Sequence, residues 1–173
     1  MPRTPSEAIA LLVGADQTVA TCESLTGGMI CAALTSVPGS SEAVRGGLIT
    51  YATDLKTTLA RVDPEVIRVH TVVSAEVAEA MARGAKAVCG ADWAVAVTGV
   101  AGPGPSHAVP AGTVWLCVSG PERTSTVLLD EPGGRADVRG EVVDAAMNLL
   151  CESLEASAKS SNAYLLGKPH GER

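Results

Sequence analysis

Short segments of apolar and β-branched residues recur along the chain and predict β-strands. Residues 18–21, 46–51 and 93–99 are rich in β-branched side chains and are bounded by Gly or polar residues, which predicts strands. The run WAVAVTG at 93–99 is apolar on both faces, as expected for a strand inside a sheet. Residues 113–119 and 123–130 are separated by GPE and predict a hairpin.

Other segments carry apolar residues at helical spacing. Helices are predicted over residues 6–13, 28–34 and 53–62, and Thr53 is the expected N-cap of the third. Ser74 is the expected cap of a longer helix, and the last helix follows the sequence EPGG. The apolar faces of these two helices comprise Val77, Met81, Ala85 and Val88 in the first, and Val138, Val142, Ala145 and Leu149 in the second.

Strands that alternate with helices, followed by a hairpin, are typical of an α/β layered domain with a mixed sheet. At 173 residues one domain is expected, and we place it at residues 1–156. Residues 157–173 are rich in Ser and mixed in character, so a flexible C-terminal tail is predicted there.

Composition and charge narrow the classes of function. The formal net charge of −6 argues against direct nucleic-acid binding, which requires a basic face, but it allows one small anion held by a local Arg or Lys. No apolar run approaches the length of a membrane span, and the N-terminus lacks a signal-peptide pattern, so a cytoplasmic protein with no membrane partner is expected.

The cysteines do not form a recognisable framework. They are odd in number, scattered and without a CxxC pair, which disfavours a zinc site or disulfides. We therefore expect small core residues at all five positions: Cys22, Cys31, Cys89, Cys117 and Cys151.

The sequence SLTGG joins a predicted strand to a predicted helix. Ser24, Thr26, Gly27 and Gly28 would place hydroxyls and unpaired N–H groups at a helix N-terminus, which favours an anion or substrate site. An ordinary tight turn between strand and helix is the alternative.

A second group of candidate residues follows in VPGSS and GGLITYATDLK. A serine such as Ser41 needs a base to become a nucleophile, and no His stands at a spacing that suggests a triad. Lys56 could serve if burial lowers its pKa, with Tyr51 to relay or orient the proton. A surface lysine with a half-buried tyrosine is the alternative.

The third group lies beyond the most strand-like segment. Thr98 and Gly99 end that segment, where α/β sheets tend to bind ligands. Arg135, in GGRADVR, opens the last helix and could hold a carboxylate or phosphate through two hydrogen bonds. A solvated arginine is the alternative.

Six motifs occur in an order and spacing that resemble one known family. They are ESLTGG, SVPGSS, GGLITY with Lys56 five residues after Tyr51, VSAEVAEAMARGA, VTGVAGP and GTVW. Together they resemble the C-terminal domain of the competence/damage-inducible CinA family, over residues 18–154. The resemblance implies a three-layer α/β/α sandwich.

The resemblance also implies an activity. Stand-alone members of the family are deamidases that convert nicotinamide mononucleotide to nicotinic acid mononucleotide and ammonia through a serine–lysine pair, without a cofactor or metal. By motif, the implied catalytic residues are Ser41, Tyr51, Lys56 and Ser24. The implied substrate-binding residues are Thr26, Gly27, Gly28, Thr98, Gly99 and Arg135.

We favour Ser41 over Ser24 as the nucleophile, with Lys56 as its base. Two alternatives remain open: a non-catalytic binding module associated with competence or DNA damage, and a Ser/Lys amidase for another small amide. A homodimer is also expected. The chain departs from the family pattern in the loop GPSHAVPAG and at Gly134, which bears on substrate preference rather than on reaction class.

Overall fold

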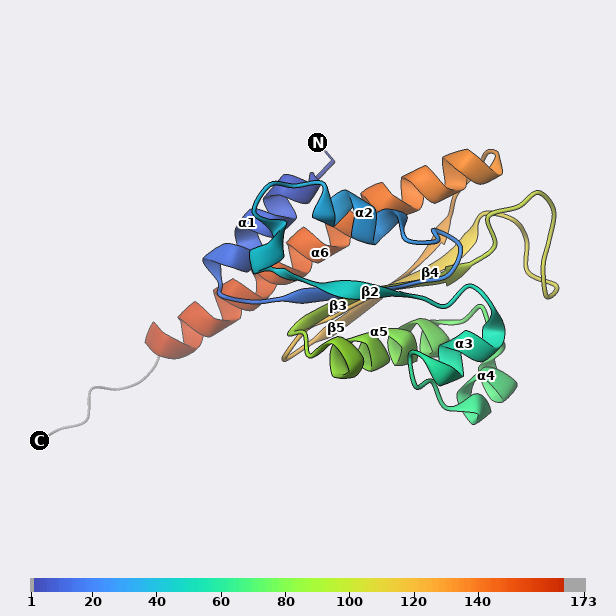
Figure 1. Cartoon of the computed structure of the whole chain (residues 1–173), viewed down its shortest axis with the longest axis horizontal. Coiled ribbons are helices and arrows are strands. Elements are labelled where there is room, and N and C mark those ends of the chain that lie inside the picture. Colours follow the sequence, from blue (N-terminus) through green and yellow to red (C-terminus); the bar gives the residue numbers. More distant parts are fainter. Residues whose placement is uncertain (1, 167–173) are drawn as a thin grey trace, which may run out of the picture.

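The computed structural model describes residues 2–166, of which the side chains are described up to residue 160 (Figure 1). Strands and helices alternate along the first half of the chain, a hairpin follows, and a long helix comes last. The strands are β1 (Val19–Glu23), β2 (Val44–Ile49), β3 (Trp93–Gly99), β4 (Thr113–Ser119) and β5 (Thr124–Asp130). The helices are α1 (Pro5–Gly14), α2 (Met29–Thr35), α3 (Thr53–Thr58), α4 (Pro64–His70), α5 (Ala75–Cys89) and α6 (Arg135–Leu166), with a short 3-10 turn, η1, at Ser40–Glu42.

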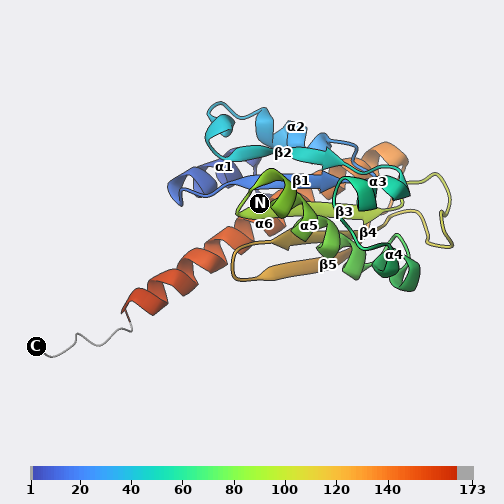
Figure 2. The same ribbon diagram turned by 60° about the horizontal axis from the view of Figure 1, so that its bottom comes forward.

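The five strands form one mixed sheet in the order β2-β1-β3-β4-β5. β1, β2 and β3 are parallel to one another, whereas β4 and β5 form the predicted hairpin and run antiparallel to their neighbours. Helices cover both faces, with α1, α2 and α6 on one side and α3, α4 and α5 on the other (Figures 1 and 2). The predicted three-layer α/β/α fold is confirmed.

The central strand β3 shows why both faces must be covered. Trp93 to Thr98 are buried, and successive side chains point to opposite faces of the sheet. Val95 and Val97 join the apolar cluster formed with α1, α2 and α6, whereas Ala94 and Ala96 join the cluster formed with α5. The smaller side chains therefore lie on the α5 face.

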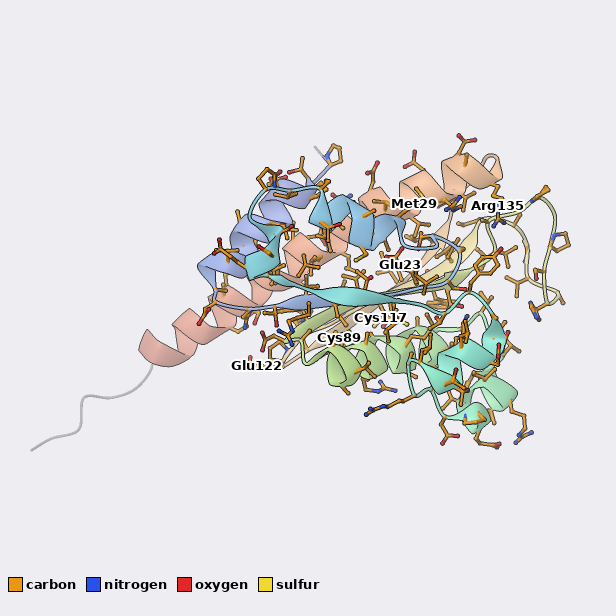
Figure 3. The ribbon with its side chains drawn as sticks, in the orientation of Figure 1. Glu23, Met29, Cys89, Cys117, Glu122 and Arg135 are labelled. Atoms are coloured by element: carbon orange, nitrogen blue, oxygen red, sulfur yellow. The ribbon has the colours of Figure 1, made fainter. Side chains whose placement is uncertain are left out.

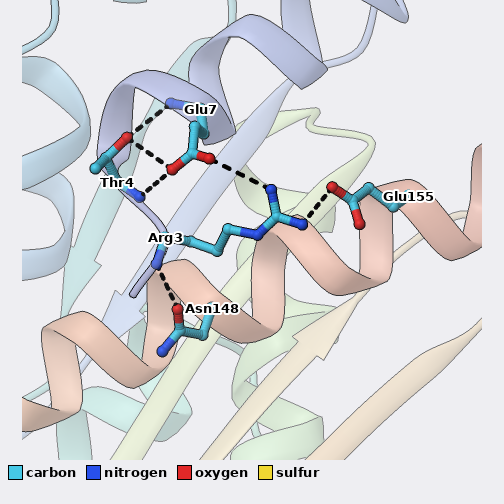
Figure 4. Close-up of polar contacts among 5 residues, drawn as sticks. All are labelled: Arg3, Thr4, Glu7, Asn148 and Glu155. Carbon is cyan, nitrogen blue, oxygen red and sulfur yellow. Dashed lines mark hydrogen bonds and ion pairs between the residues drawn. The ribbon is translucent and has the colours of Figure 1, made fainter. Parts of the chain in front are cut away.

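Polar contacts fasten the N-terminus to α6 (Figure 4). Thr4 and Glu7 form a capping box at the start of α1. The N–H of Arg3 donates to Asn148 Oδ1 at 2.7 Å, and its guanidinium pairs with Glu155 at 2.6 Å. Because both side chains are about one-third exposed, this ion pair contributes little to stability.

The predicted helix at 53–62 is shorter than expected. Ala52, not Thr53, is the N-cap of α3, and the helix ends at Thr58. A separate helix, α4, follows; Asp63 caps it and Pro64 occupies its first turn. The sequence did not predict α4 as a separate helix. All its side chains are at least partly exposed, so it has no strong apolar stripe.

The predicted apolar faces of the two long helices are partly wrong. In α5, Val88 is 39 % exposed, so the buried face ends before it. In α6, Val138 and Val142 are buried as predicted. Farther along the helix Ala146 and Leu150 are fully buried, whereas the predicted Ala145 and Leu149 are only partly buried.

The predicted tail is also partly wrong, because α6 continues through Leu166. No Gly or Pro interrupts the sequence from residue 141 to residue 166, so nothing in that stretch breaks a helix. Residues 167–173 lie outside the described part of the chain. None of the described helices is long and apolar enough to cross a membrane.

The sheet topology places three loops together at one edge. The chain leaves β1 for β2 on one side and then crosses to β3 on the other side of β1. The carboxyl ends of these three parallel strands therefore meet at a point where the strand order reverses. Open α/β sheets bind ligands at such points.

Gly84 in α5 allows the segment after α3 to approach the backbone of α5 closely. A Cβ at position 84 would lie 1.6 Å from the carbonyl oxygen of Ala60, whereas a Cβ at Gly140 in α6 would have no heavy atom within 4 Å. The absence of a side chain at Gly84 is therefore required, and that at Gly140 is not.

We predict that Gly84→Ala lowers the free energy of unfolding by about 2–3 kcal/mol or more, because the backbone carbonyl must move. The matched control, Gly140→Ala, should raise it by about 0.5–1 kcal/mol through helix propensity. Urea denaturation measures both. Equal effects of the two substitutions would contradict the close approach.

Candidate functional site

A cavity of about 290 Å³ opens at the carboxyl ends of the parallel strands. Its volume is at the lower end of the range of small-molecule sites. It is lined by residues that follow β1, β2 and β3, by the loop between β3 and β4, and by the start of α6. The predicted site residues that line it are Ser24, Tyr51, Lys56, Thr98, Gly99 and Arg135.

Lys56 lies at the floor of this cavity and is only 1 % exposed. Its Nζ donates to the carbonyl oxygen of Thr50 at 2.7 Å and to Ser24 Oγ at 3.2 Å. No carboxylate pairs with it among the described residues. Burial away from water disfavours the ammonium and lowers the pKa of Lys56 below its usual value. The alternative of a surface lysine is therefore wrong.

Cys22 lies close to Lys56 and to Thr50. A thiolate there would favour the ammonium of Lys56, but burial raises the pKa of Cys22 to about 11. The thiol is therefore uncharged near neutral pH, and it does not compensate the effect of burial on the lysine. Cys22 is a small core residue, as expected.

Glu23 is the residue that the sequence analysis missed. It is fully buried at the end of β1, next to Ser24, beneath α2 (Figure 3). Oε1 accepts hydrogen bonds from β1 and from the first turn of α2, and Oε2 accepts them from the strand–helix turn and from the first turn of α2. The donors to Oε1 are Thr21 Oγ1 (3.1 Å) and Cys31 N (2.8 Å), and the donors to Oε2 are Thr26 Oγ1 (2.7 Å), Gly28 N (3.0 Å) and Ile30 N (3.0 Å).

These hydrogen bonds occupy the donors of the predicted anion site. The N–H groups at the start of α2 and the Thr26 hydroxyl already bind the internal carboxylate, and Gly27 N donates to the carbonyl of Ser24. The prediction that Thr26, Gly27 and Gly28 bind substrate is therefore wrong for these donors. A Glu directly before a Ser/Thr/Gly-rich turn was the available signal.

The glycines of the turn have a conformational role instead. Gly27 and Gly28 have φ values of 61° and 102°, in the left-handed region that favours glycine. These conformations make the turn sharp enough to bring α2 back over Glu23. This strand–turn–helix junction holds Ser24 at the cavity.

Ser41 lies away from Lys56. It is exposed on η1, before β2, and does not line the cavity, whereas Lys56 follows the other end of β2. A strand of 6 residues spans about 20 Å, so the two side chains are too far apart for proton transfer. The favoured pairing of Ser41 with Lys56 is corrected: the serine beside Lys56 is Ser24.

Tyr51 and Arg135 meet at the mouth of the cavity. Tyr51 is 60 % exposed, and Arg135 Nη2 donates to its hydroxyl at 3.0 Å. Arg135 Nη1 donates to the carbonyl of Gly102 at 2.9 Å, so the guanidinium joins α6 to the β3–β4 loop (Figure 3). Tyr51 has no hydrogen bond to Lys56, and a proton relay through it is not part of this geometry.

Thr98 and Gly99 form a side wall. Thr98 Oγ1 donates to the carbonyl of Val72 at 2.7 Å, which ties β3 to the segment before α5. A Cβ at Gly99 would lie 2.6 Å from the carbonyl oxygen of Thr113, so β4 requires glycine there. Both residues shape the cavity. Among the described residues, no group of three or more His, Cys, Asp or Glu side chains could hold a metal ion.

Comparison with protein families gives a match that covers most of the chain. The model of the CinA C-terminal domain matches residues 3–154. Curated relatives called "CinA-like protein" include one from Mycobacterium marinum, 47 % identical over 142 residues, and one from Mycolicibacterium gilvum, 48 % identical over 147 residues. These matches cover 81 % and 84 % of this chain but only 33 % and 34 % of the relatives, so the chain spans about a third of their length.

Solved structures agree with the fold. A competence-damaged protein (CinA) superfamily member from Klebsiella pneumoniae has a TM-score of 0.85 and 29 % identity, over 88 % of this chain and 96 % of that chain. The competence/damage inducible protein CihA from Agrobacterium tumefaciens has a TM-score of 0.79 and 33 % identity, over 90 % and 99 %.

We predict that Glu23→Gln lowers the free energy of unfolding by about 2–4 kcal/mol, because an amide nitrogen would then face buried N–H donors. Thr21→Val removes a single neutral donor from the same carboxylate and should cost only about 1 kcal/mol. Chemical denaturation of both variants provides the test. A Glu23→Gln variant no less stable than Thr21→Val would contradict the role of the carboxylate.

Proposed function

Since the chain belongs to the CinA C-terminal domain family, we propose that it is an amidohydrolase that deamidates nicotinamide mononucleotide with Ser24 as nucleophile and Lys56 as base. The observation that carries the proposal is the contact between Lys56 Nζ and Ser24 Oγ at the floor of a cavity. A buried lysine beside a serine, at the ligand-binding edge of an α/β sheet, is suited to activating the hydroxyl.

The protonation state of Lys56 determines whether this pair can react. In the neutral amine one N–H still donates to the carbonyl of Thr50, and the lone pair can accept the proton of Ser24 Oγ. Burial supplies the required lowering of the pKa without a second cation. Ser24 can therefore be deprotonated as its oxygen attacks the carboxamide carbon.

The remaining steps use the same groups. Attack gives a tetrahedral oxyanion, and the N–H of Leu25, which has no acceptor among the described residues, is placed beside Ser24 to stabilise it. Lys56 returns the proton to the leaving nitrogen, and ammonia departs. Water then attacks the acyl ester and gives its proton to Lys56. Lys56 passes this proton to Ser24 Oγ as the C–O bond breaks, which releases the carboxylic acid and restores the neutral amine.

The mouth of the cavity supports the nucleotide part of the substrate. Arg135 is exposed there, and its guanidinium is oriented by Gly102 and Tyr51, which leaves further N–H donors for a phosphate. Lys56 lies at the buried end. A substrate with a carboxamide at one end and a phosphate at the other matches this arrangement.

We predict that the wild-type protein releases ammonia from nicotinamide mononucleotide and that Ser24→Ala loses at least about a thousandfold in kcat. Ser41→Ala is the matched control and should keep wild-type activity, since Ser41 lies outside the cavity. Enzyme-coupled ammonia detection measures all three proteins. If the wild type does not turn over nicotinamide mononucleotide, the proposed deamidase activity is refuted. If activity is lost only in Ser41→Ala, the assignment of Ser24 as the nucleophile is refuted.

A second prediction concerns pH. Because only neutral Lys56 accepts a proton, kcat/KM should rise about tenfold per pH unit below the lowered pKa and level off above it. The plateau should begin below pH 10.5, the ordinary value for lysine. Lys56→Met should be inactive throughout. A wild-type profile that rises only above that value would argue against the lysine base.

A further inference from the structure

The charges around the cavity differ from those of the whole protein. The chain carries a formal net charge of −6, yet no Asp or Glu among the described residues lines the cavity. The side chains there that can carry positive charge are Lys56, Arg135 and His107. Lys56 is at the buried floor, whereas Arg135 and His107 are exposed at the mouth. The mouth therefore favours an anionic group.

His107 is held there by an unusual hairpin in the β3–β4 loop. Ser106 and Val109 form reciprocal backbone hydrogen bonds of 3.0 and 2.9 Å, with only His107 and Ala108 between them. Those two residues have φ values of 52° and 59°. Positive φ at both central residues is the mark of a type I′ turn, in which Asn and Gly are preferred.

His and Ala in this turn have a conformational cost. The fold does not require these two residue types there. Asn-Gly would form the same hairpin with less strain. Strained residues of this kind tend to lie at binding sites. Of the two, His107 lines the cavity and Ala108 does not. The turn thus presents an imidazole to the cavity.

A contact within the turn fixes this imidazole. Ser106 Oγ lies 3.0 Å from His107 Nδ1. When the serine hydroxyl donates to Nδ1, the proton of a neutral imidazole is on Nε2, which is then a donor. A protonated imidazole also donates from Nε2. In both forms the ring can donate to an anion.

We propose that His107 and Arg135 together form a phosphate-binding subsite at the mouth of the cavity, with His107 as a specificity-determining residue for substrates that carry a phosphate monoester. Arg135 already uses two N–H groups to join Tyr51 and Gly102, so His107, in the β3–β4 loop, supplies an independent donor. The proposal rests on the proposed function, because the phosphate is that of the nucleotide substrate.

The test measures binding of ribose 5-phosphate and of ribose by calorimetry to wild type, His107→Asn and Ala108→Gly. Asn is favoured in a type I′ turn, so His107→Asn keeps the hairpin and removes only the imidazole. We expect it to weaken ribose 5-phosphate binding about three- to tenfold, as for loss of one charge-assisted hydrogen bond at a solvated site. Ala108→Gly relaxes the neighbouring residue and should bind as wild type does.

Kinetics extend the test to the substrate. His107→Asn should raise KM for nicotinamide mononucleotide by a similar factor and leave kcat unchanged, since His107 is remote from Ser24 and Lys56. Unchanged ribose 5-phosphate binding in His107→Asn, or equal binding of ribose and ribose 5-phosphate by wild type, would overturn the subsite. Because this binding needs no turnover, failure of the deamidase and failure of the subsite are separate results.

Discussion

The carboxylate of Glu23 is the interaction on which the site depends. It is buried at the end of a central strand, and five donors from β1, the following turn and α2 converge on it. A buried carboxylate is tolerated only when it is fully hydrogen-bonded, so the turn must adopt this one conformation. Ser24, the next residue, is thereby held at the carboxyl ends of the parallel strands. The same bonds use the donors that an external anion would otherwise find there.

A second constraint is the burial of Lys56 without a carboxylate partner. In the described part of the chain, its Nζ has only neutral oxygens, from Thr50 and Ser24, within hydrogen-bonding distance. An arrangement built for stability alone would pair or expose such a charge. The close packing of Gly84 against Ala60 fixes the segment after α3, and with it the position of the lysine. The protein thus uses backbone packing to maintain a lysine whose pKa is lowered, the property that general-base catalysis requires.

The division between a buried reactive end and a charged mouth follows from the topology. Ser24 and Lys56 come from the segments that follow β1 and β2, at the carboxyl ends of these strands. Arg135 and His107 come from the start of α6 and from the β3–β4 loop, which extend beyond the sheet (Figure 1). Under the proposed function, substrate recognition would lie on elements that can change without disturbing Ser24 and Lys56. The loop GPSHAVPAG is one of these elements.

The sequence by itself determined the alternation of strands and helices, the mixed α/β fold and the identity of Lys56, because apolar periodicity and local motif order are properties of neighbouring residues. It did not determine which serine meets that lysine. Ser41 is nearer to Lys56 along the chain than Ser24 is, yet it lies at the other end of the sheet. Nor could it show that SLTGG binds Glu23, because the same donors suit an external anion. Long-range pairing of β1 with β2 decided the first question, by placing together strand ends that are far apart in sequence. The burial of Glu23 at the end of β1, beneath α2, decided the second.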